Sequence, residues 1–338
     1  MSKRYGIPYM GSKNGIAQDI VNLLPPRENL YDLFCGGCAI THCAIENNKF
    51  RNYYINDIRP NQAQFFLDCV NGKYKNETRW ISREQFMKEY KTDPYISCVW
   101  SFGNKGYTYI YGKDIEPLKK ALHYAIVFND YSLLKEQGYD IPNFSDIENM
   151  NERRKRICKF MKTTYKEINP NMQSLQSLER LQSLERLESL ERLESLVRLQ
   201  RLKRLQSLNK IDKLSNRIQA SCLDYSQVDV KPNSVIYCDI PYENTGKYLA
   251  NKREAFDYER FYEWACNQKE LVVISSYEIK DNRFTCVWQK EKLCLLNQFR
   301  DGRNIKIERL YIPSNQLEIW NSYNGLINKK QLSIFDIE

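Results

Sequence analysis

Residues 30–57 constrain the fold of this chain most, because they alternate between strand-like and helix-like sequence. A β-favouring run at 30–34 is followed by a Cys-Gly-Gly-Cys turn and then by a helix-favouring stretch at 39–48. A second strand-like run at 53–55 leads to Asp57. A strand, a helix and a second strand in this order form a βαβ unit, whose strands lie parallel in one sheet. We therefore expect an α/β fold.

Strand-like sequence returns only after residue 218. Short runs at 235–238, 271–275 and 310–312 have strand-like sequence, so the sheet is expected to resume there. A chain of 338 residues has room for about two domains, or for one domain with a large insertion. The position of the runs favours the insertion, because one sheet is begun before residue 70 and completed after 218.

The sequence between the two sheet-forming parts has a different character. It is rich in Tyr, Lys and Trp, and aromatic and β-branched residues flank a Gly-containing turn at 100–112, which predicts a hairpin. The predicted organisation is a sheet domain formed by 1–72 and 218–338, an inserted module at 73–170, and a low-complexity repeat at 173–208.

The repeat places a leucine at every third position from Leu175 to Leu208, twelve in all. Successive residues of an α-helix advance by about 100°, so leucines three apart drift by about 60° per step and circle the helix. This drift disfavours a steady two-stranded coiled coil. The abundance of Leu, Glu, Gln and Arg still predicts a helix, with a solenoid-like stack of short turns as the alternative. The simplest function for such a repeat is a spacer.

Charge and hydropathy exclude some classes of protein. The net charge of +9 suits a polyanionic partner such as nucleic acid without requiring one. No stretch of about 18 apolar residues could span a bilayer, and the N-terminus lacks the apolar core of a secretory signal. We therefore expect a cytoplasmic protein without a membrane partner.

The eleven cysteines are expected to be reduced in that compartment. Cys35, Cys38, His42 and Cys43 lie close together in the sequence, but they lack the paired, well-separated ligands of a structural zinc site. No metal is predicted. A redox pair at Cys35 and Cys38 is not favoured either, because the glycines between them suggest a ligand-binding loop.

The first candidate site is the Gly-rich turn after the first predicted strand, with Asp32, Phe34, Gly36 and Gly37. Such a turn lets backbone approach a ligand closely, and the helix that follows offers free N–H groups to an anionic group. Asp57, at the end of the next strand, could accept hydrogen bonds from both hydroxyls of a ribose. Together they suggest a nucleoside-bearing cofactor; the alternative is an ordinary tight turn and a solvent-facing Asp.

The second candidate site is the tetrad Asp239-Ile240-Pro241-Tyr242, directly after the predicted strand at 235–238. The lone pair of an exocyclic amino group on a base is delocalised into the ring, and two acceptors can draw its hydrogens out of plane. Asp239 would supply a carboxylate and Ile240 a backbone carbonyl, which Pro241 helps to aim. Tyr242 offers a ring on which an extruded base could stack. The alternative is a plain strand-end turn.

These motifs, in this order, resemble the Dam-like DNA adenine-N6 methyltransferases. Tyr9, Gly11 and Lys13 are similar to that family's N-terminal aromatic-x-Gly-x-Lys motif, which touches the cofactor. Phe34 and the glycines after it resemble its F-x-G-x-G cofactor loop, and Asp57 resembles its ribose-binding acid.

The C-terminal part carries two further similarities. Asp224-Tyr225 resembles the family's Asp-aromatic pair beside the cofactor adenine, and residues 239–242 resemble its D-P-P-Y tetrad. The likeness is good over 1–70 and 218–312, and it is loose over the inserted module.

The resemblance implies a Rossmann-like methyltransferase sheet with an inserted target-recognition module. The implied reaction is site-specific transfer of a methyl group from S-adenosylmethionine to N6 of a flipped adenine, with double-stranded DNA as partner and no metal. It also implies a prokaryotic or phage-encoded setting, such as restriction-modification.

The chain departs from the family pattern at two positions. Cys38 stands where the cofactor loop usually ends in Gly, and Ile240 replaces the first Pro of the tetrad. They keep open a catalytically weak or inactive protein that still binds S-adenosylmethionine and DNA. Asp239 favours adenine, because amino-cytosine enzymes commonly have Ser there, and methylation of cytosine or of RNA adenine remains a further alternative.

DNA contacts are predicted in the inserted module. Asn104 and Lys105 would lie at the hairpin tip, with Tyr107 and Tyr109 behind them, and could reach a groove or fill the gap left by a flipped base. The basic run Arg153, Arg154, Lys155 and Arg156 suits phosphate contacts that set register without reading sequence. The alternatives are a plain hairpin and a solvated helix face.

Overall fold

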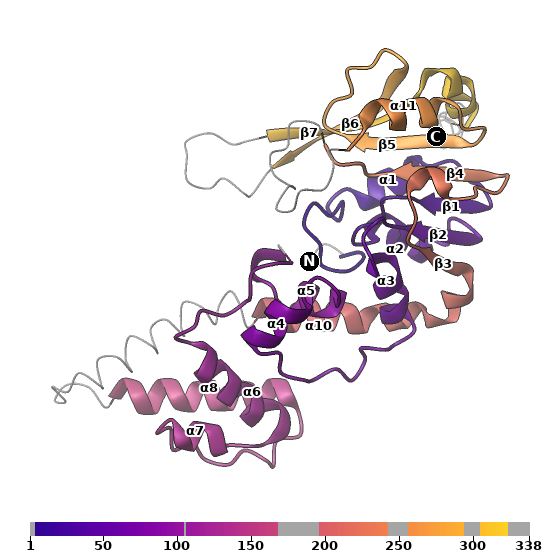
Figure 1. Ribbon diagram of the computed structural model, residues 1–338. Coiled ribbons are helices and arrows are strands. Elements are labelled where there is room, and N and C mark those ends of the chain that lie inside the picture. Colours follow the sequence, from indigo (N-terminus) through magenta and orange to yellow (C-terminus); the bar gives the residue numbers. More distant parts are fainter. Residues whose placement is uncertain (1–3, 105, 168–195, 243–255, 294–304, 324–338) are drawn as a thin grey trace, which may run out of the picture. The chain divides into compact units, whose positions relative to one another are not determined.

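The computed structural model describes residues 4–104, 106–167, 196–242, 256–293 and 305–323 (Figure 1). The chain divides into two compact units. We call Met1–Lys73 with Ser207–Glu338 the sheet unit, and Tyr74–Gln206 the helical unit. The assignment of catalysis to one and DNA recognition to the other stays a prediction.

The sheet unit holds a seven-stranded sheet in the order β3-β2-β1-β4-β5-β7-β6. The first five strands in this order run parallel, and β7 is antiparallel to both of its neighbours. The order changes direction between β1 and β4, which creates the switch point where open α/β sheets bind ligands. The predicted Rossmann-like sheet is confirmed. The strands are β1 Asn29–Asp32, β2 Asn52–Asn56, β3 Ile218–Ser221, β4 Ser234–Cys238, β5 Leu271–Ser276, β6 Phe284–Leu293 and β7 Ile305–Pro313.

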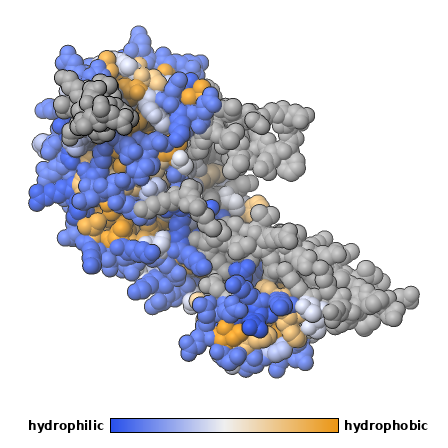
Figure 2. All heavy atoms as spheres, turned by 180° about the vertical axis from the view of Figure 1, so that it is seen from behind, coloured by the Kyte–Doolittle hydropathy of each residue, from blue (hydrophilic) through white to orange (hydrophobic). Residues whose placement is uncertain are grey.

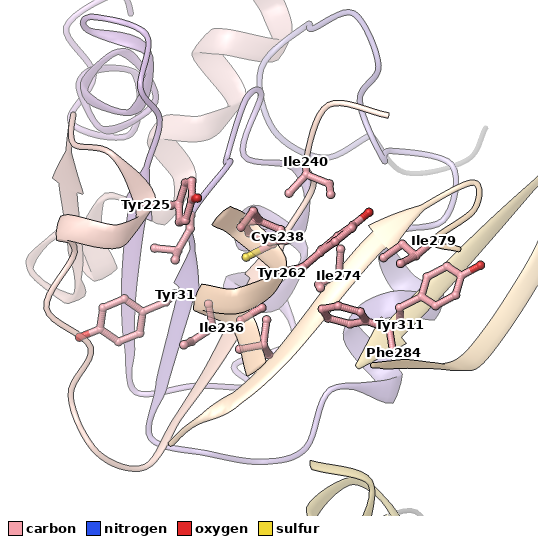
Figure 3. Packing of buried hydrophobic residues seen from close by; sticks show 14 residues of the cluster. Tyr31, Tyr225, Ile236, Cys238, Ile240, Tyr262, Ile274, Ile279, Phe284 and Tyr311 are labelled. Atoms are coloured by element: carbon pink, nitrogen blue, oxygen red, sulfur yellow. The ribbon is translucent and has the colours of Figure 1, made fainter. Parts of the chain in front are cut away.

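One face of the sheet packs against helix α11 (Tyr258–Cys266). Tyr31 pairs in register with Ile236, and Ile236 with Val272, so that three neighbouring strands present side chains to this face at one level. Phe261 of α11 belongs to the same buried cluster, part of which is labelled in Figure 3. Asp257 starts the helix by accepting a hydrogen bond from the Arg260 amide. This packing fixes the carboxyl-terminal ends of β4 and β5.

The opposite face is covered by α2 (Ala39–Glu46), with α1 (Ala17–Leu23) packed beside it. Side chains alternate along a strand, so Asp32 points away from the α11 face that receives Tyr31. Thr41 of α2 donates a 2.7 Å hydrogen bond to Asp32 Oδ2. Helix α3 (Gln62–Val70) follows β2 and contacts β3. The sheet is therefore covered on both faces.

The helical unit is built around an aromatic core. Trp80 packs edge-on against Trp100 and stacks on Tyr111, with centroid distances of 5.1 Å and 5.6 Å. Its described helices are α4 Arg83–Glu89, α5 Pro94–Val99, α6 Glu116–Phe128, α7 Ser132–Glu136, α8 Met150–Glu167 and the greater part of α10 Leu196–Leu208.

The hairpin predicted over 100–112 is formed only in part: the Phe102 amide donates to the Thr108 carbonyl and the Ile110 amide to the Trp100 carbonyl, but the described residues there form no regular strands. The chain does turn back, through a single antiparallel bridge between Ser101 and Tyr109. Phe102 to Asn104 form a short 3-10 turn instead of a strand end. Trp100 and Tyr109 are buried in the aromatic core, and the Tyr109 hydroxyl donates to the Ile81 carbonyl. These aromatic side chains are buried in a core, whereas along a regular hairpin successive side chains alternate between a buried and an exposed face.

The repeat is described only at its C-terminal end, where α10 confirms a helix; residues 173–195 lie outside the described part. Arg201 is buried and donates to the carbonyls of Cys98 and Ser101 at the end of α5, at 3.2 Å and 2.6 Å. Leu205 and Leu208 are also buried. This end of the repeat is therefore part of the fold, which a plain spacer would not be.

On the face seen in Figure 2, the described residues are mostly hydrophilic, with smaller hydrophobic areas between them. No helix among the described residues is long and apolar enough to cross a membrane. The described residues also contain no group of His, Cys, Asp and Glu side chains placed to hold a metal ion.

Candidate active site

The predicted cofactor and catalytic residues all belong to the sheet unit. Asp32, Asn56 and Cys38 mark the ends of β1 and β2 and the start of α2, and Asp239 directly follows β4. The carboxyl ends of these parallel strands lie at one edge of the sheet. Residues far apart in the sequence are therefore brought to one place.

The glycines of the turn after β1 are needed by the N-terminal segment that packs on it. The Ile7 amide donates to the Gly37 carbonyl at 2.8 Å. A Cβ on Gly37 would lie 2.7 Å from the Tyr9 Cβ and 2.8 Å from the Ile7 carbonyl oxygen. The turn therefore holds Tyr9, a predicted cofactor residue, against the loop. Packing against the N-terminal segment therefore explains the glycine at position 37 without reference to a ligand.

Cys38 caps α2 in the left-handed conformation, with φ of 53°. A residue with a Cβ pays roughly 1–2 kcal/mol for this conformation, and glycine does not. The Cys38 side chain is fully buried, and its thiol is free. The departure from Gly thus adds backbone strain in the loop, while the side chain itself points into the protein.

Asp57 is held from two sides. Its Oδ2 accepts from the Gly36 amide at 3.0 Å, which ties the end of β2 to the turn after β1. The Arg59 guanidinium donates to both Asp57 oxygens, at 3.1 Å and 3.0 Å, and stacks 4.6 Å from the Tyr9 ring centroid. A ribose that bonds to Asp57 must therefore share it with Arg59 or displace the guanidinium.

Asp32 lies under the turn with only 2% of its surface exposed. Burial raises the pKa of this carboxyl from its ordinary 3.8 to about 7; the Thr41 hydrogen bond opposes the shift, and the negative charges of Asp239 and Asp57 add to it. Asp32 is thus a buried acid at the centre of the predicted cofactor site.

Asp224 and Tyr225 form the edge of the site beyond β3. The Asp224 carboxylate accepts from the Ser226 amide at 3.0 Å and from Arg260 Nη2 at 2.9 Å. Although burial alone would raise the pKa of Asp224, these hydrogen bonds and the Arg260 charge hold it below its ordinary value. The Tyr225 ring lies 5.6 Å from that of Phe34, which joins the two predicted cofactor segments.

The tetrad after β4 is joined to the N-terminus by an ion pair. Lys13 Nζ lies 2.5 Å from Asp239 Oδ1, and it also lies 4.7 Å from the centroid of the Tyr242 ring. Lys13 is buried, and the Asp239 side chain is 23% exposed. Burial raises the pKa of Asp239 above its ordinary value, and the ammonium of Lys13 opposes that shift.

A buried carboxylate on β7 completes this cluster. The Tyr242 hydroxyl donates to Glu308 Oε1, which also accepts from Ser275 Oγ at 3.1 Å and lies 3.6 Å from Lys13 Nζ. The Tyr242 ring meets Tyr277 edge-on at 4.3 Å. Burial and the nearby Asp239 and Glu308 charges raise the pKa of Tyr242, so the hydroxyl keeps its proton.

The middle of the tetrad is held by hydrophobic packing and one hydrogen bond. The Ile240 side chain is 3% exposed and belongs to the buried cluster of Figure 3. Ile in place of Pro therefore adds its bulk to the core. The Tyr258 hydroxyl donates to the Pro241 carbonyl at 3.0 Å, which restrains the backbone of the tetrad.

Residues 9–178 match the family model described as D12 class N6 adenine-specific DNA methyltransferase. That match covers half of the chain. The chain belongs to this family. It is therefore an enzyme of the class that methylates N6 of adenine in DNA, and the predicted resemblance is confirmed. No curated protein matches the chain.

The residues of this methyltransferase that we predicted to bind DNA lie in the helical unit and differ in their surroundings. Lys105 lies outside the described residues, as does the side chain of Asn104. The Tyr107 side chain is 49% exposed, as a DNA contact requires. The buried Tyr109 cannot reach a groove in this conformation.

The four basic residues at the start of α8 also differ in their burial and their partners. Arg153 is 5% exposed and donates to the carbonyls of Ile126 and Ile147, at 2.7 Å and 2.6 Å. It therefore holds α8 to the loop before it, and the phosphate contact predicted for it is wrong for this conformation. Lys155 and Arg156 are exposed and pair with Glu152 at 3.6 Å each, while Arg154 is half-buried.

Four residues near these sites were not anticipated from the sequence: Arg59, Tyr258, Arg260 and Glu308. Only Glu308 leaves a readable signal. It stands two and four residues before the buried Leu310 and Ile312, so the period of two along a strand places its carboxylate on the same buried face. A charged residue at a core position of a strand is rare unless it has a partner.

Proposed function

We propose that the chain transfers a methyl group from S-adenosylmethionine to N6 of an adenine flipped out of duplex DNA at a specific site. The proposal depends mainly on one observation, the ion pair between Lys13 and Asp239 at the end of β4. It brings the acceptor of the tetrad together with the N-terminal motif that the family uses for its cofactor.

The sheet unit suits the cofactor in its chemistry. Two buried hydroxyls in the predicted cofactor segments, Ser12 Oγ and Tyr225 Oη, have no hydrogen-bond partner within the described residues. A buried polar group normally has a partner, so these hydroxyls fit a polar ligand. Asp32 adds a buried carboxyl to this region, and its negative charge when ionised would favour a sulfonium cation. When bound, S-adenosylmethionine supplies the electrophilic methyl group.

Tyr9, Gly11, Lys13, Asp32, Phe34, Gly36, Gly37, Asp57, Asp224 and Tyr225 are the residues that would hold the cofactor. For Asp57 this requires the Arg59 guanidinium to yield at least one hydrogen bond to the ribose. The Tyr225 ring, packed among aromatic side chains, would provide a surface for the adenine of the cofactor.

In the reaction, Asp239 and the Ile240 carbonyl accept the two hydrogens of the adenine amino group. This polarisation makes the N6 lone pair available to the methyl carbon. S-adenosylmethionine, when bound, would supply the methyl group to N6, and the proton that N6 loses would pass to Asp239 or to solvent. Lys13 occupies one face of the Tyr242 ring, so the base would stack on the other face or displace the ammonium.

In the helical unit, Asn104, Lys105 and Tyr107 would approach the bases, and Arg154, Lys155 and Arg156 the phosphates. This division predicts that phosphate contacts set affinity and salt dependence, while the 104–107 loop contributes to sequence choice.

The proposal is tested with labelled S-adenosylmethionine and mixed-sequence duplex DNA. We expect N6-methyladenine in the digested product, at specific positions found by sequencing. Asp239→Ala should abolish methylation with the dissociation constant for the cofactor changed by less than about threefold, a change below 1 kcal/mol. Asp229→Ala, which alters an exposed aspartate of the same unit, is the matched control. Cofactor binding without N6-methyladenine would leave only a binding protein, and methylcytosine or modified RNA would change the substrate.

A further inference from the structure

Glu308 is an ionisable side chain in the interior of the sheet. It lies in β7, which pairs with strands on both sides, and only 1% of it is exposed. A carboxylate in such a place is costly unless donors surround it. The polar groups around Glu308 therefore indicate its role.

Within the described residues, its close polar partners belong to the candidate active site or to the strand beside it. Oε1 accepts from the Tyr242 hydroxyl and from Ser275 Oγ, and lies 3.6 Å from Lys13 Nζ. The Tyr242 hydroxyl is directed at Glu308, and it also lies close enough to Asp239 to lower the pKa of that carboxyl. Glu308 thus fixes the phenol from the β7 side, while Lys13 lies over one face of its ring.

The Lys13 ammonium lies between two carboxylates, 2.5 Å from Asp239 and 3.6 Å from Glu308. In the reaction proposed above, Asp239 must accept a hydrogen of the adenine amino group. Lys13 then loses part of its hydrogen bonding to Asp239, and a buried ammonium without a partner costs several kcal/mol. Glu308 is the second acceptor within reach.

We propose that Glu308 is a positioning residue for methyl transfer, which fixes the Tyr242 phenol and retains Lys13 while Asp239 exchanges the lysine for the adenine amino group. This inference rests on the proposed function. It assigns Glu308 no contact with the adenine or with the cofactor.

The test is a double-mutant cycle on Glu308 and Tyr242. Glu308→Gln keeps a hydrogen-bond acceptor and removes the charge, and Tyr242→Phe keeps the ring and removes the hydroxyl. Each should slow single-turnover methylation at saturating cofactor about tenfold to a hundredfold, the range for losing a hydrogen bond to a charged group. The double variant should be slowed by much less than the product of the two single effects, because both changes remove the same hydrogen bond between Tyr242 and Glu308. Glu291→Gln, on the exposed part of β6, should leave the rate unchanged.

A merely structural role gives a different pattern. If Glu308→Gln lowers cofactor affinity and methylation rate in parallel, or if the two single effects multiply in the double variant, the inference is overturned. Should Glu308→Gln fail to fold, Tyr242→Phe combined with Ser275→Ala removes two donors to Oε1 and leaves the carboxylate in place. An unchanged transfer rate in that variant also overturns it.

Failure of the proposed function is recognised separately. A wild-type chain that makes no methylated base refutes that function, and the inference is then tested by NMR with 13C at the tyrosine ζ carbons. The Tyr242 signal is the one missing in Tyr242→Phe. It should move in Glu308→Gln and stay in place in Glu291→Gln; an unmoved signal in Glu308→Gln overturns the inference whether or not the chain is active.

Discussion

The ammonium of Lys13 lies 2.5 Å from the carboxylate of Asp239, although 226 positions separate the two residues in the chain. The N-terminal segment is therefore part of the candidate active site. The close contact also means that neither charge can be changed without affecting the other.

Replacing Lys13 by Met should abolish methylation and lower the free energy of unfolding by roughly 2–3 kcal/mol. This is below the range for a fully buried pair because Asp239 is 23% exposed. Adding Asp239→Asn removes the unpaired charge, so the double variant should regain part of the lost stability and no activity. Urea unfolding and the methylation assay measure the two properties. Lys269→Met, an exposed control, should stay within about 0.5 kcal/mol of wild type; equal stabilities of Lys13→Met and its double variant would contradict the pairing.

The buried Asp32 should make stability depend on pH. Its pKa is raised to about 7 in the folded protein, so between about pH 4 and 7 the folded state binds a proton that the unfolded state has lost. The contribution of this group to stability therefore falls as pH rises through that window, by up to roughly 4 kcal/mol for a shift of about three pH units.

In the Asp32→Asn variant the side chain cannot ionise, and its amide oxygen can still accept the hydrogen bond from the Thr41 hydroxyl. Its stability relative to wild type should be near zero at pH 4.5 and clearly positive at pH 8, by chemical unfolding at both values. We expect weaker cofactor binding as the cost, because a negative charge near the sulfonium is lost. A difference in stability that is the same at both pH values would show that Asp32 ionises normally in the folded state.

The described end of the leucine repeat should be needed for stability. Arg201→Ala leaves the carbonyls at the end of α5 without their buried donor and should lower the free energy of unfolding by roughly 2–3 kcal/mol. Lys203→Ala changes an exposed residue of the same helix and should be nearly neutral. Thermal unfolding distinguishes them, and equal midpoints would restore the spacer interpretation for this segment.

The packing of the N-terminal segment should be intolerant of a methyl group at Gly6. Its φ is +68°, and a Cβ there would lie 2.1 Å from the Gly37 carbonyl oxygen. Gly6→Ala should therefore cost at least about 2 kcal/mol, since backbone must move and a left-handed conformation is strained. Gly15→Ala meets nothing within 4 Å and serves as the control. Similar unfolding midpoints for the two variants would show that the segment does not pack in this way.

Much of the fold was predictable because its signals are local. Apolar runs of strand length, a Gly-rich turn and a helix-favouring stretch each depend on neighbouring residues, and they indicated the parallel sheet interrupted after residue 70. Local signals misled over 100–112, where aromatic side chains that would suit a hairpin pack into a helical core. They misled again at Arg153, since a basic side chain on a helix does not reveal whether backbone carbonyls surround it.

The sequence by itself determined the order and chemistry of the motifs: the turn after β1, the acid after β2 and the tetrad after β4. Only the tertiary structure decided which charges meet. The contacts of Lys13 with Asp239 and of Tyr242 with Glu308 depend on how segments that are distant in the sequence lie side by side. Arg59 is close to Asp57 in the sequence, but only the local backbone conformation turns its guanidinium onto that carboxylate. Electrostatic interactions act over a few ångströms in space whatever the separation along the chain, so the pattern of residue types carries little information about them.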